Sequence, residues 1–200
     1  MPTKCSDTAE TTVPSLLSII KKELHASMNG VASAAMRRTD DYRVNWGVEL
    51  PRLQAIAAEF GKNHELAQAL WKESVRECKI LAALIQPTET FCEELADIWV
   101  ESIHTVEIAQ IVSLYLFQHL PYATSQAFCW IASDNEIRQL CGLSTIYHIA
   151  RQREIQERSV EELYDQAQSM CESSNMNVRK LANNLIALLD EKYEREHPAC

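Results

Sequence analysis

Glycine and proline are scarce in this sequence, and their scarcity limits the folds that it can adopt. The 200 residues include 4 glycines and 6 prolines. Sheets need frequent tight turns, which consume these residues, so long helices with short connections are expected. No apolar run reaches the roughly 18–20 residues that span a bilayer, so no membrane partner is expected. Residues 1–12 are polar, lack the apolar stretch of a signal peptide and are expected to form a flexible tail.

Paired cysteines and cofactor motifs are also missing. The seven cysteines are scattered, and none forms a C-x-x-C pair. This pattern is typical of reduced thiols, so a cytoplasmic protein without a disulfide framework is expected. The cysteines have no metal-ligand spacing, and neither glycine-rich nucleotide loops nor G-x-S-x-G occur. We therefore expect neither a metal nor a cofactor.

Positive charge is missing from the middle of the chain. The formal net charge is −9, and no lysine or arginine occurs between Ile80 and Ile137. The same stretch holds eight carboxylates: Glu89, Glu93, Glu94, Asp97, Glu101, Glu107, Asp134 and Glu136. A DNA-binding surface neutralises phosphates with basic side chains. The central segment is therefore too acidic for an ordinary DNA-binding surface, and it favours a basic protein partner as an alternative.

What the sequence does contain is a repeated helical pattern. In four places a polar cluster, a β-branched residue and then Arg or Glu precede a long apolar helix. The β-branched residues are Val75, Val106, Ile137 and Val178, at steps of 31, 31 and 41 residues. A further helix is expected before each of these, at residues 64–72, 90–102, 122–131 and 160–172. A period of this size is typical of a solenoid, because stacked helix pairs share one continuous core.

We therefore predict an all-α fold, a right-handed α-α superhelix (solenoid) of HEAT-like helix pairs. Residues 13–195 are expected to form its single domain. Capping boxes are predicted to start three of the helices, and they pair Thr90 with Glu93, Ser133 with Glu136, and Ser159 with Glu162.

Three segments resemble the AlkD-type family of DNA alkylation repair glycosylases. They are residues 42–51 (YRVNWGVELP), 70–77 (LWKESVRE) and 130–135 (WIASDN), and the resemblance covers roughly residues 42–192. It implies a curved α-superhelix whose concave face holds duplex DNA with alkylated bases. The implied chemistry suits such bases, since a carboxylate stabilises the positive charge growing on the sugar and aromatic rings hold a cationic base.

The family's catalytic Trp and Asp are not kept in register here. Without gaps, their positions fall on Glu101 and Thr105; with one gap, they fall on Val100 and His104. Glu107 is the nearest replacement carboxylate.

The family's catalytic Arg and later Trp are also out of register. The Arg position falls on Leu140, and Arg138 lies two residues short of it, which on a helix is about 200° around the axis. The last Trp position falls near Asn184.

Four residues are candidates for catalysis: Glu107, Trp99, Glu101 and His104. Glu101 and His104 also end a ridge with helical spacing that starts at Glu94 and continues through Asp97. Such a ridge could form a metal or acid–base site, but di-metal carboxylate sites need two E-x-x-H elements and no second one occurs. A solvated acidic face is therefore the default interpretation.

Five residues are candidates for binding: Trp46, Trp130, Arg76, Arg138 and Arg179. The tryptophans could stack on bases, but most are flanked by apolar residues, which favours packing in the core. The arginines recur at one repeat position. They could bind phosphates, or they could form a structural ladder that pairs each with an acidic group of the neighbouring repeat.

The preferred function is a relative of the repair proteins without their usual glycosylase residues, acting as a DNA- or protein-binding scaffold. One alternative is an active glycosylase that uses Glu107 as its carboxylate and Trp99 as its aromatic wall. The other is an acidic protein-interaction module. If DNA is the partner, we expect weak, salt-sensitive binding through the basic ends.

Overall fold

The described chain is built from helices. The computed structural model describes residues 12–39, 44–152, 155 and 157–196, so the predicted tail lies outside the described residues except for Thr12. The elements are α1 (Val13–Ala26), α2 (Gly30–Thr39), α3 (Leu50–Phe60), α4 (His64–Trp71), α5 (Arg76–Ile85), α6 (Glu93–Glu101), α7 (Val106–Tyr115), the 3-10 turn η1 (Phe117–His119), α8 (Ala123–Ile131), α9 (Glu136–Gln152), α10 (Glu157–Met170) and α11 (Met176–Glu196).

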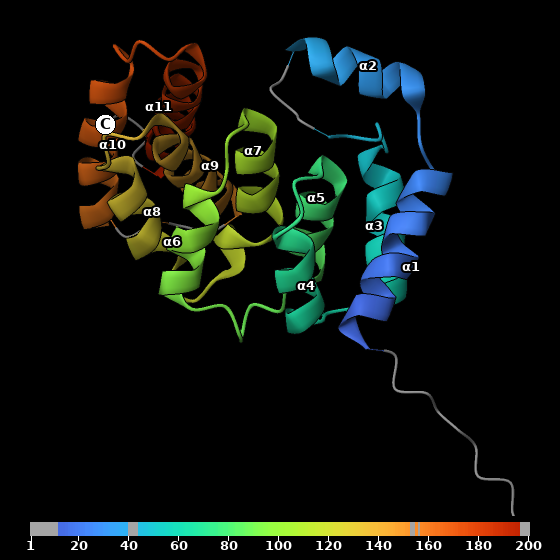
Figure 1. The fold of residues 1–200 in the computed structure, drawn as a ribbon. Helices are drawn as coiled ribbons and strands as arrows, with labels where there is room; N and C mark the ends of the chain where they lie inside the picture. Colours follow the sequence, from blue (N-terminus) through green and yellow to red (C-terminus); the bar gives the residue numbers. More distant parts are fainter. Residues whose placement is uncertain (1–11, 40–43, 153–154, 156, 197–200) are drawn as a thin grey trace, which may run out of the picture.

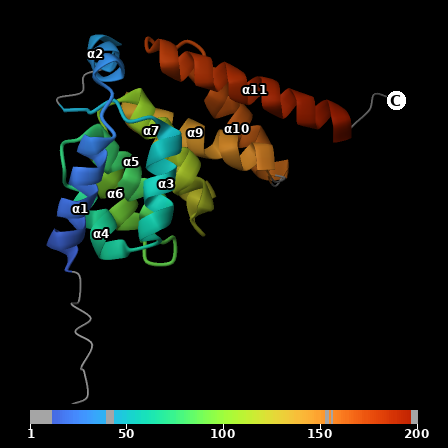
Figure 2. The same ribbon diagram turned by 90° about the vertical axis from the view of Figure 1, so that its right-hand side faces the viewer.

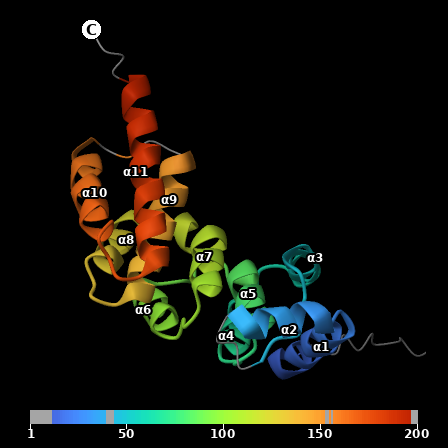
Figure 3. The ribbon, with the colours of Figure 1, turned by 90° about the horizontal axis from the view of Figure 1, so that it is seen from above.

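These helices form two concentric arcs (Figures 1 and 3). The outer arc contains α1, α4, α6, α8 and α10, and the inner arc contains α3, α5, α7, α9 and α11. Along the inner arc each helix packs on the next, while α4 packs on α5, α8 on α9 and α10 on α11. This is the predicted solenoid, and the four helices expected ahead of the repeat positions are α4, α6, α8 and α10.

Side-chain caps start several of these helices. Asn63 and Thr105 accept hydrogen bonds from the backbone N–H groups of Leu66 and Ile108, at 3.0 and 3.4 Å. Asn135 and Asn175 play the same role at α9 and α11. Because an N-cap satisfies backbone donors that have no partner in the helix, these residues fix where α4, α7, α9 and α11 begin.

The three capping-box predictions were wrong. Helix α6 follows Cys92 and not Thr90, and α10 begins at Glu157, before Ser159. At α9 the cap is Asn135, while the Ser133 hydroxyl accepts the N–H of Asn135 in the preceding turn. An Asn next to the first turn reaches the orphan N–H groups more directly than a Ser further back.

Tryptophan rings join neighbouring outer helices. Trp71 of α4 stacks on Trp99 of α6, with ring centroids 3.9 Å apart and ring planes within 2°. Phe91 meets Trp99 edge-on at 4.8 Å, and Trp130 of α8 packs on Phe117 at the same distance. Trp99 and Trp130 are each 1% exposed. These rings therefore belong to the continuous core that links the repeats.

A further copy of the repeat edge, at residues 44–49, escaped the sequence analysis. Val44 lies 31 residues before Val75 and pairs with it in a parallel bridge. The backbone N–H of Arg76 donates to the Val44 carbonyl at 3.1 Å. The extended chain here takes the place of an inner-helix start, and α2 stands above this end of the stack (Figure 2).

Within the described residues, no helix combines the length and apolar character that crossing a membrane requires.

Helices α8 and α9 approach each other closely because residue 142 is glycine. A Cβ atom on Gly142 would lie 2.6 Å from the carbonyl oxygen of Ala127 and 2.7 Å from Cγ1 of Ile131. Both neighbours are held in the core, so a side chain here forces the two helices apart.

Gly142→Ala is expected to lower the free energy of unfolding by about 2 kcal/mol, the usual cost of overpacking a core. Gly30→Ala is the matched control, because no atom lies within 4 Å of its Cβ position and the residue is helical. That variant is expected to be as stable as the wild type or up to about 1 kcal/mol more stable. Urea denaturation measures both, and equal stability of the two variants would contradict the close approach.

Candidate functional site

The first turns of the inner helices lie in a row along one edge of the superhelix. Arg76, Glu107, Arg138 and Arg179 each directly follow the β-branched residue of their repeat, and they lie in the first turn of α5, α7, α9 and α11. Helix N-termini carry partial positive charge and free backbone donors, so an edge made of several of them attracts anions. The side chains along this row decide how much of that charge is available.

Arg76 and Glu107 form a bidentate ion pair between neighbouring repeats. Arg76 Nε lies 2.7 Å from Glu107 Oε2, and its Nη2 donates to Oε1 of the same carboxylate. Arg76 is 4% exposed, whereas the Glu107 side chain is 31% exposed. Both carboxylate oxygens of Glu107 are therefore bound by one buried guanidinium.

A buried carboxylate, Glu77, holds the 44–49 segment against α5. It accepts hydrogen bonds from three successive backbone N–H groups, those of Trp46, Gly47 and Val48, at 3.0 to 3.3 Å. It also accepts from Arg76 Nη1 at 3.2 Å, and the same nitrogen donates to the Val48 carbonyl. Glu77 is fully buried, so these donors replace the water that its charge would otherwise need.

Glycine is required in this segment. Gly47 has a φ of 69°, and a Cβ there would lie 2.4 Å from the Asn29 carbonyl oxygen and 2.5 Å from the Ser33 nitrogen. Both the left-handed backbone and the lack of space exclude other residues. The turn that presents three N–H groups to Glu77 therefore depends on Gly47.

Arg138 is also engaged by carboxylates of the preceding repeat. Its Nη2 donates to Glu101 at 2.9 Å, and its Nη1 lies 3.6 Å from Asp97. Asp97 in turn accepts from the Trp130 indole N–H at 2.7 Å and from Gln126 at 3.0 Å. Arg138 thus pairs as expected of a ladder, and so does Arg76 with Glu107.

The last arginine of the row binds backbone. Arg179 donates to the carbonyl of Ser173 at 2.7 Å and contacts that of Ser174. The contact between the start of α9 and the start of α11 is made by Glu136, which accepts a hydrogen bond from Asn175 Nδ2 at 2.7 Å. The ladder of arginine–carboxylate pairs therefore ends before α11.

Comparison with known proteins identifies the family of this chain. Residues 20–195 match the family described as DNA alkylation repair enzyme. The chain belongs to this DNA alkylation repair family.

A solved structure supports the same fold. It is described as a new family of proteins related to the HEAT-like repeat DNA glycosylases with affinity for branched DNA structures. It superposes with a TM-score of 0.83 at 18% identity, covering 91% of this chain and 79% of that chain. No curated protein matches the sequence.

The catalytic candidates of this family member do not form a common site. Trp99 is covered by Trp71 on one face and by the edge of Phe91 on another side, so its ring is not open to a base. Helix α6 ends at Glu101, so His104 lies in the following turn and the ridge is not continuous. Within the described residues, no three His, Cys, Asp or Glu side chains are placed to hold a metal ion.

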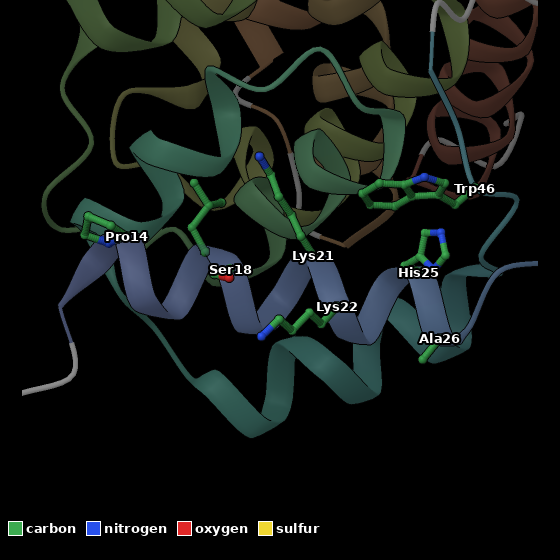
Figure 4. A pocket seen from close by; sticks show the side chains of 8 residues that line it. Pro14, Ser18, Lys21, Lys22, His25, Ala26 and Trp46 are labelled. Carbon is green, nitrogen blue, oxygen red and sulfur yellow. The ribbon is translucent and has the colours of Figure 1, made fainter.

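Trp46 lies beside an open groove. The groove has a volume of about 680 Å³ and is lined by α1 residues together with Trp46 (Figure 4). Trp46 meets His25 edge-on at 6.4 Å at one end of the groove, while Lys21 extends from the middle of α1 (Figure 4). The ammonium of Lys21 is paired with Glu73 at 2.8 Å.

Other polar side chains on the inner helices were not found from the sequence. Gln54 of α3 donates to the Tyr115 hydroxyl of α7 at 2.9 Å, which joins two helices that flank α5. On α9, burial lowers the pKa of His148, and the charges of Arg151 and His119 lower it further. The Gln54–Tyr115 contact joins residues 61 positions apart, so no local pattern points to it.

Glu77→Gln is expected to lower the free energy of unfolding by about 3 kcal/mol, because it breaks a buried ion pair and presents an amide N–H₂ to backbone donors. Glu93→Gln on α6 makes the same chemical change at an exposed position and is expected to cost less than about 0.5 kcal/mol. Denaturant unfolding measures both. Similar stabilities would show that the 44–49 segment does not depend on Glu77.

Proposed function

We propose that this chain is a DNA-binding scaffold of the alkylation repair family that does not cleave the glycosidic bond. DNA would lie along the inner arc and the edge formed by the inner-helix N-termini. The proposal rests mainly on the Arg76–Glu107 ion pair.

This pair argues against a glycosylase because of what the reaction requires. A carboxylate that stabilises a positively charged sugar must direct its charge at the sugar. Glu107 is the nearest carboxylate to the family's catalytic position, and both its oxygens bind Arg76. Because Glu107 is already paired with the cationic Arg76 side chain, little of its charge is available to a cationic sugar. Trp99 offers no open ring as an aromatic wall.

The placement of the acidic residues supports DNA as the partner. Of the eight central carboxylates, four lie on the outer helix α6: Glu93, Glu94, Asp97 and Glu101. The two on inner helices, Glu107 and Glu136, are both hydrogen-bonded to neighbouring repeats. The inner helices therefore carry two of the eight central carboxylates, which lowers the electrostatic cost of bringing DNA there.

The structural relative adds to this proposal, since its description includes affinity for branched DNA structures. Binding by the present chain is expected to be modest and salt-sensitive, because arginines along the edge are already paired. Contacts to two to four phosphates give a slope of log K against log salt of roughly −2 to −4.

A second candidate is a basic protein partner that binds the outer side. The exposed carboxylates Glu93, Glu94 and Glu101 on α6 favour it. Charge complementarity of this kind mainly accelerates association.

The test compares Glu107→Gln with Glu93→Gln, which remove one carboxylate from the inner edge and one from the outer helix. Fluorescence anisotropy with plain duplex and four-way-junction DNA measures binding. We expect Glu107→Gln to bind about two- to fivefold more tightly, since it removes a negative charge from the inner edge while Arg76 stays held by Glu77, and Glu93→Gln to bind like the wild type.

A glycosylase assay on duplex containing 7-methylguanine completes the test. No release above background is expected from the wild type or from Glu107→Gln. Release by the wild type that is lost in Glu107→Gln would replace the scaffold with an active glycosylase. Absence of DNA binding at low salt would favour the protein partner.

A further inference from the structure

A second, smaller pocket lies between the α4–α5 and α6–α7 helix pairs, beside the Arg76–Glu107 ion pair. Its volume is about 380 Å³. It is bounded by the α4–α5 turn, the first turn of α5 and the α6–α7 turn. Cationic or imidazole side chains line it from both repeats: Lys72, Arg76, Lys79 and His104. Three hydroxyl groups lie among them, those of Ser74, Ser102 and Thr105.

The charge balance of this pocket is positive, although it borders the most acidic stretch of the sequence. Glu73 is the one carboxylate in its lining, and it is paired with Lys21 at 2.8 Å. Glu107 lies next to the pocket but is held by Arg76. The charges of Lys72 and Lys79 therefore remain without a carboxylate in the lining to balance them.

Lys79 is held in place before any ligand arrives. Its ammonium donates to the Trp71 carbonyl at 3.0 Å and lies 4.2 Å from the centroid of the Trp71 ring. Trp71 is itself fixed by its stack on Trp99 and by its indole hydrogen bond to Ser102 at 2.8 Å. A preorganised donor loses little entropy on binding, which favours a specific site over a loose cationic surface.

Burial makes an anion favourable here. Arg76 and Thr105 are both more than nine-tenths buried. Burial lowers the pKa of Lys79, which means that its charged form is poorly solvated. An anion in the pocket supplies the interaction that water does not.

We propose that this pocket binds a phosphoryl group, using Lys72 and Lys79 as its charged contacts and the His104 ring and the Ser74 hydroxyl as further polar contacts. The volume lies near the lower end of the range for ligand sites, so it suits a phosphate with its sugar and not a base pair. This inference rests on the proposed function only for the source of the phosphate. That source is either a DNA strand or a free nucleotide.

The first experiment uses inorganic phosphate and no DNA. The full chain with labelled histidine is titrated with phosphate, and with sodium chloride at matched ionic strength, while NMR follows the His104 ring resonances. His104→Gln assigns the signal. We expect a saturable shift with phosphate and not with chloride.

Variants of the exposed residues then locate the site. Lys72→Gln is expected to weaken phosphate binding about fivefold, as for loss of one partly exposed charge contact. Lys62→Gln is the matched control, because its ammonium caps carbonyls at the opposite end of α5. Lack of saturation with phosphate, or equal binding by Lys72→Gln and the wild type, would overturn the inference.

The second experiment identifies the source. Duplexes with a 5′-phosphate and with a 5′-hydroxyl end are compared by anisotropy with the wild type and Lys72→Gln. Tighter binding of the phosphorylated duplex, lost in Lys72→Gln, assigns the pocket to strand ends. Equal binding that weakens in the variant assigns it to internal phosphates. If phosphate saturates but no duplex binds, the pocket stands, its source is a free nucleotide, and the proposed function fails.

Discussion

The buried Glu77 carboxylate is the interaction on which the N-terminal half of this structure depends. It gathers three successive backbone N–H groups and the Arg76 guanidinium, so it ties the 44–49 segment to α5. A charge without water has to be satisfied in full, because each missing donor costs desolvation energy. Arg76 can therefore move little, and its other nitrogens orient Glu107 on the next repeat. A structural requirement in the core thus determines the chemistry available at the edge.

Negative charge is distributed unequally between the two arcs. Sequence alone shows a central segment with eight carboxylates and no lysine or arginine. In the fold, α6 carries half of them on the outer arc, and Arg138 from the next repeat binds two of those, Glu101 and Asp97. Local net charge is thus a poor guide to the potential at one face of a solenoid, since the two helices of each pair point their exposed sides in opposite directions.

The sequence predicts the helix pairs well because their period depends on the core. Apolar stripes and a 31-residue step are enough to place α4 to α9. The site is less predictable, because its partners are set by packing. Glu101 and His104 have helical spacing, yet the helix ends at Glu101. Residues 44–49 lie one 31-residue period before the first repeat position but have no helical pattern. Their role is seen only from their hydrogen bonds to Glu77.

The 31-residue period also explains why these contacts form one system. Five hydrogen-bonded pairs join residues that lie one period of 31 residues apart. They are Trp46–Glu77, Gln68–Trp99, Trp71–Ser102, Arg76–Glu107 and Phe91–Tyr122. Each joins equivalent positions of adjacent repeats, so a rotation of one repeat strains all of them together. The step to the last repeat is 41 residues, and its contacts are of a different kind, from Glu136 to Asn175. The first three repeats therefore form a rigid frame that fixes the phosphate pocket, whereas the pitch of the last repeat is set by separate contacts.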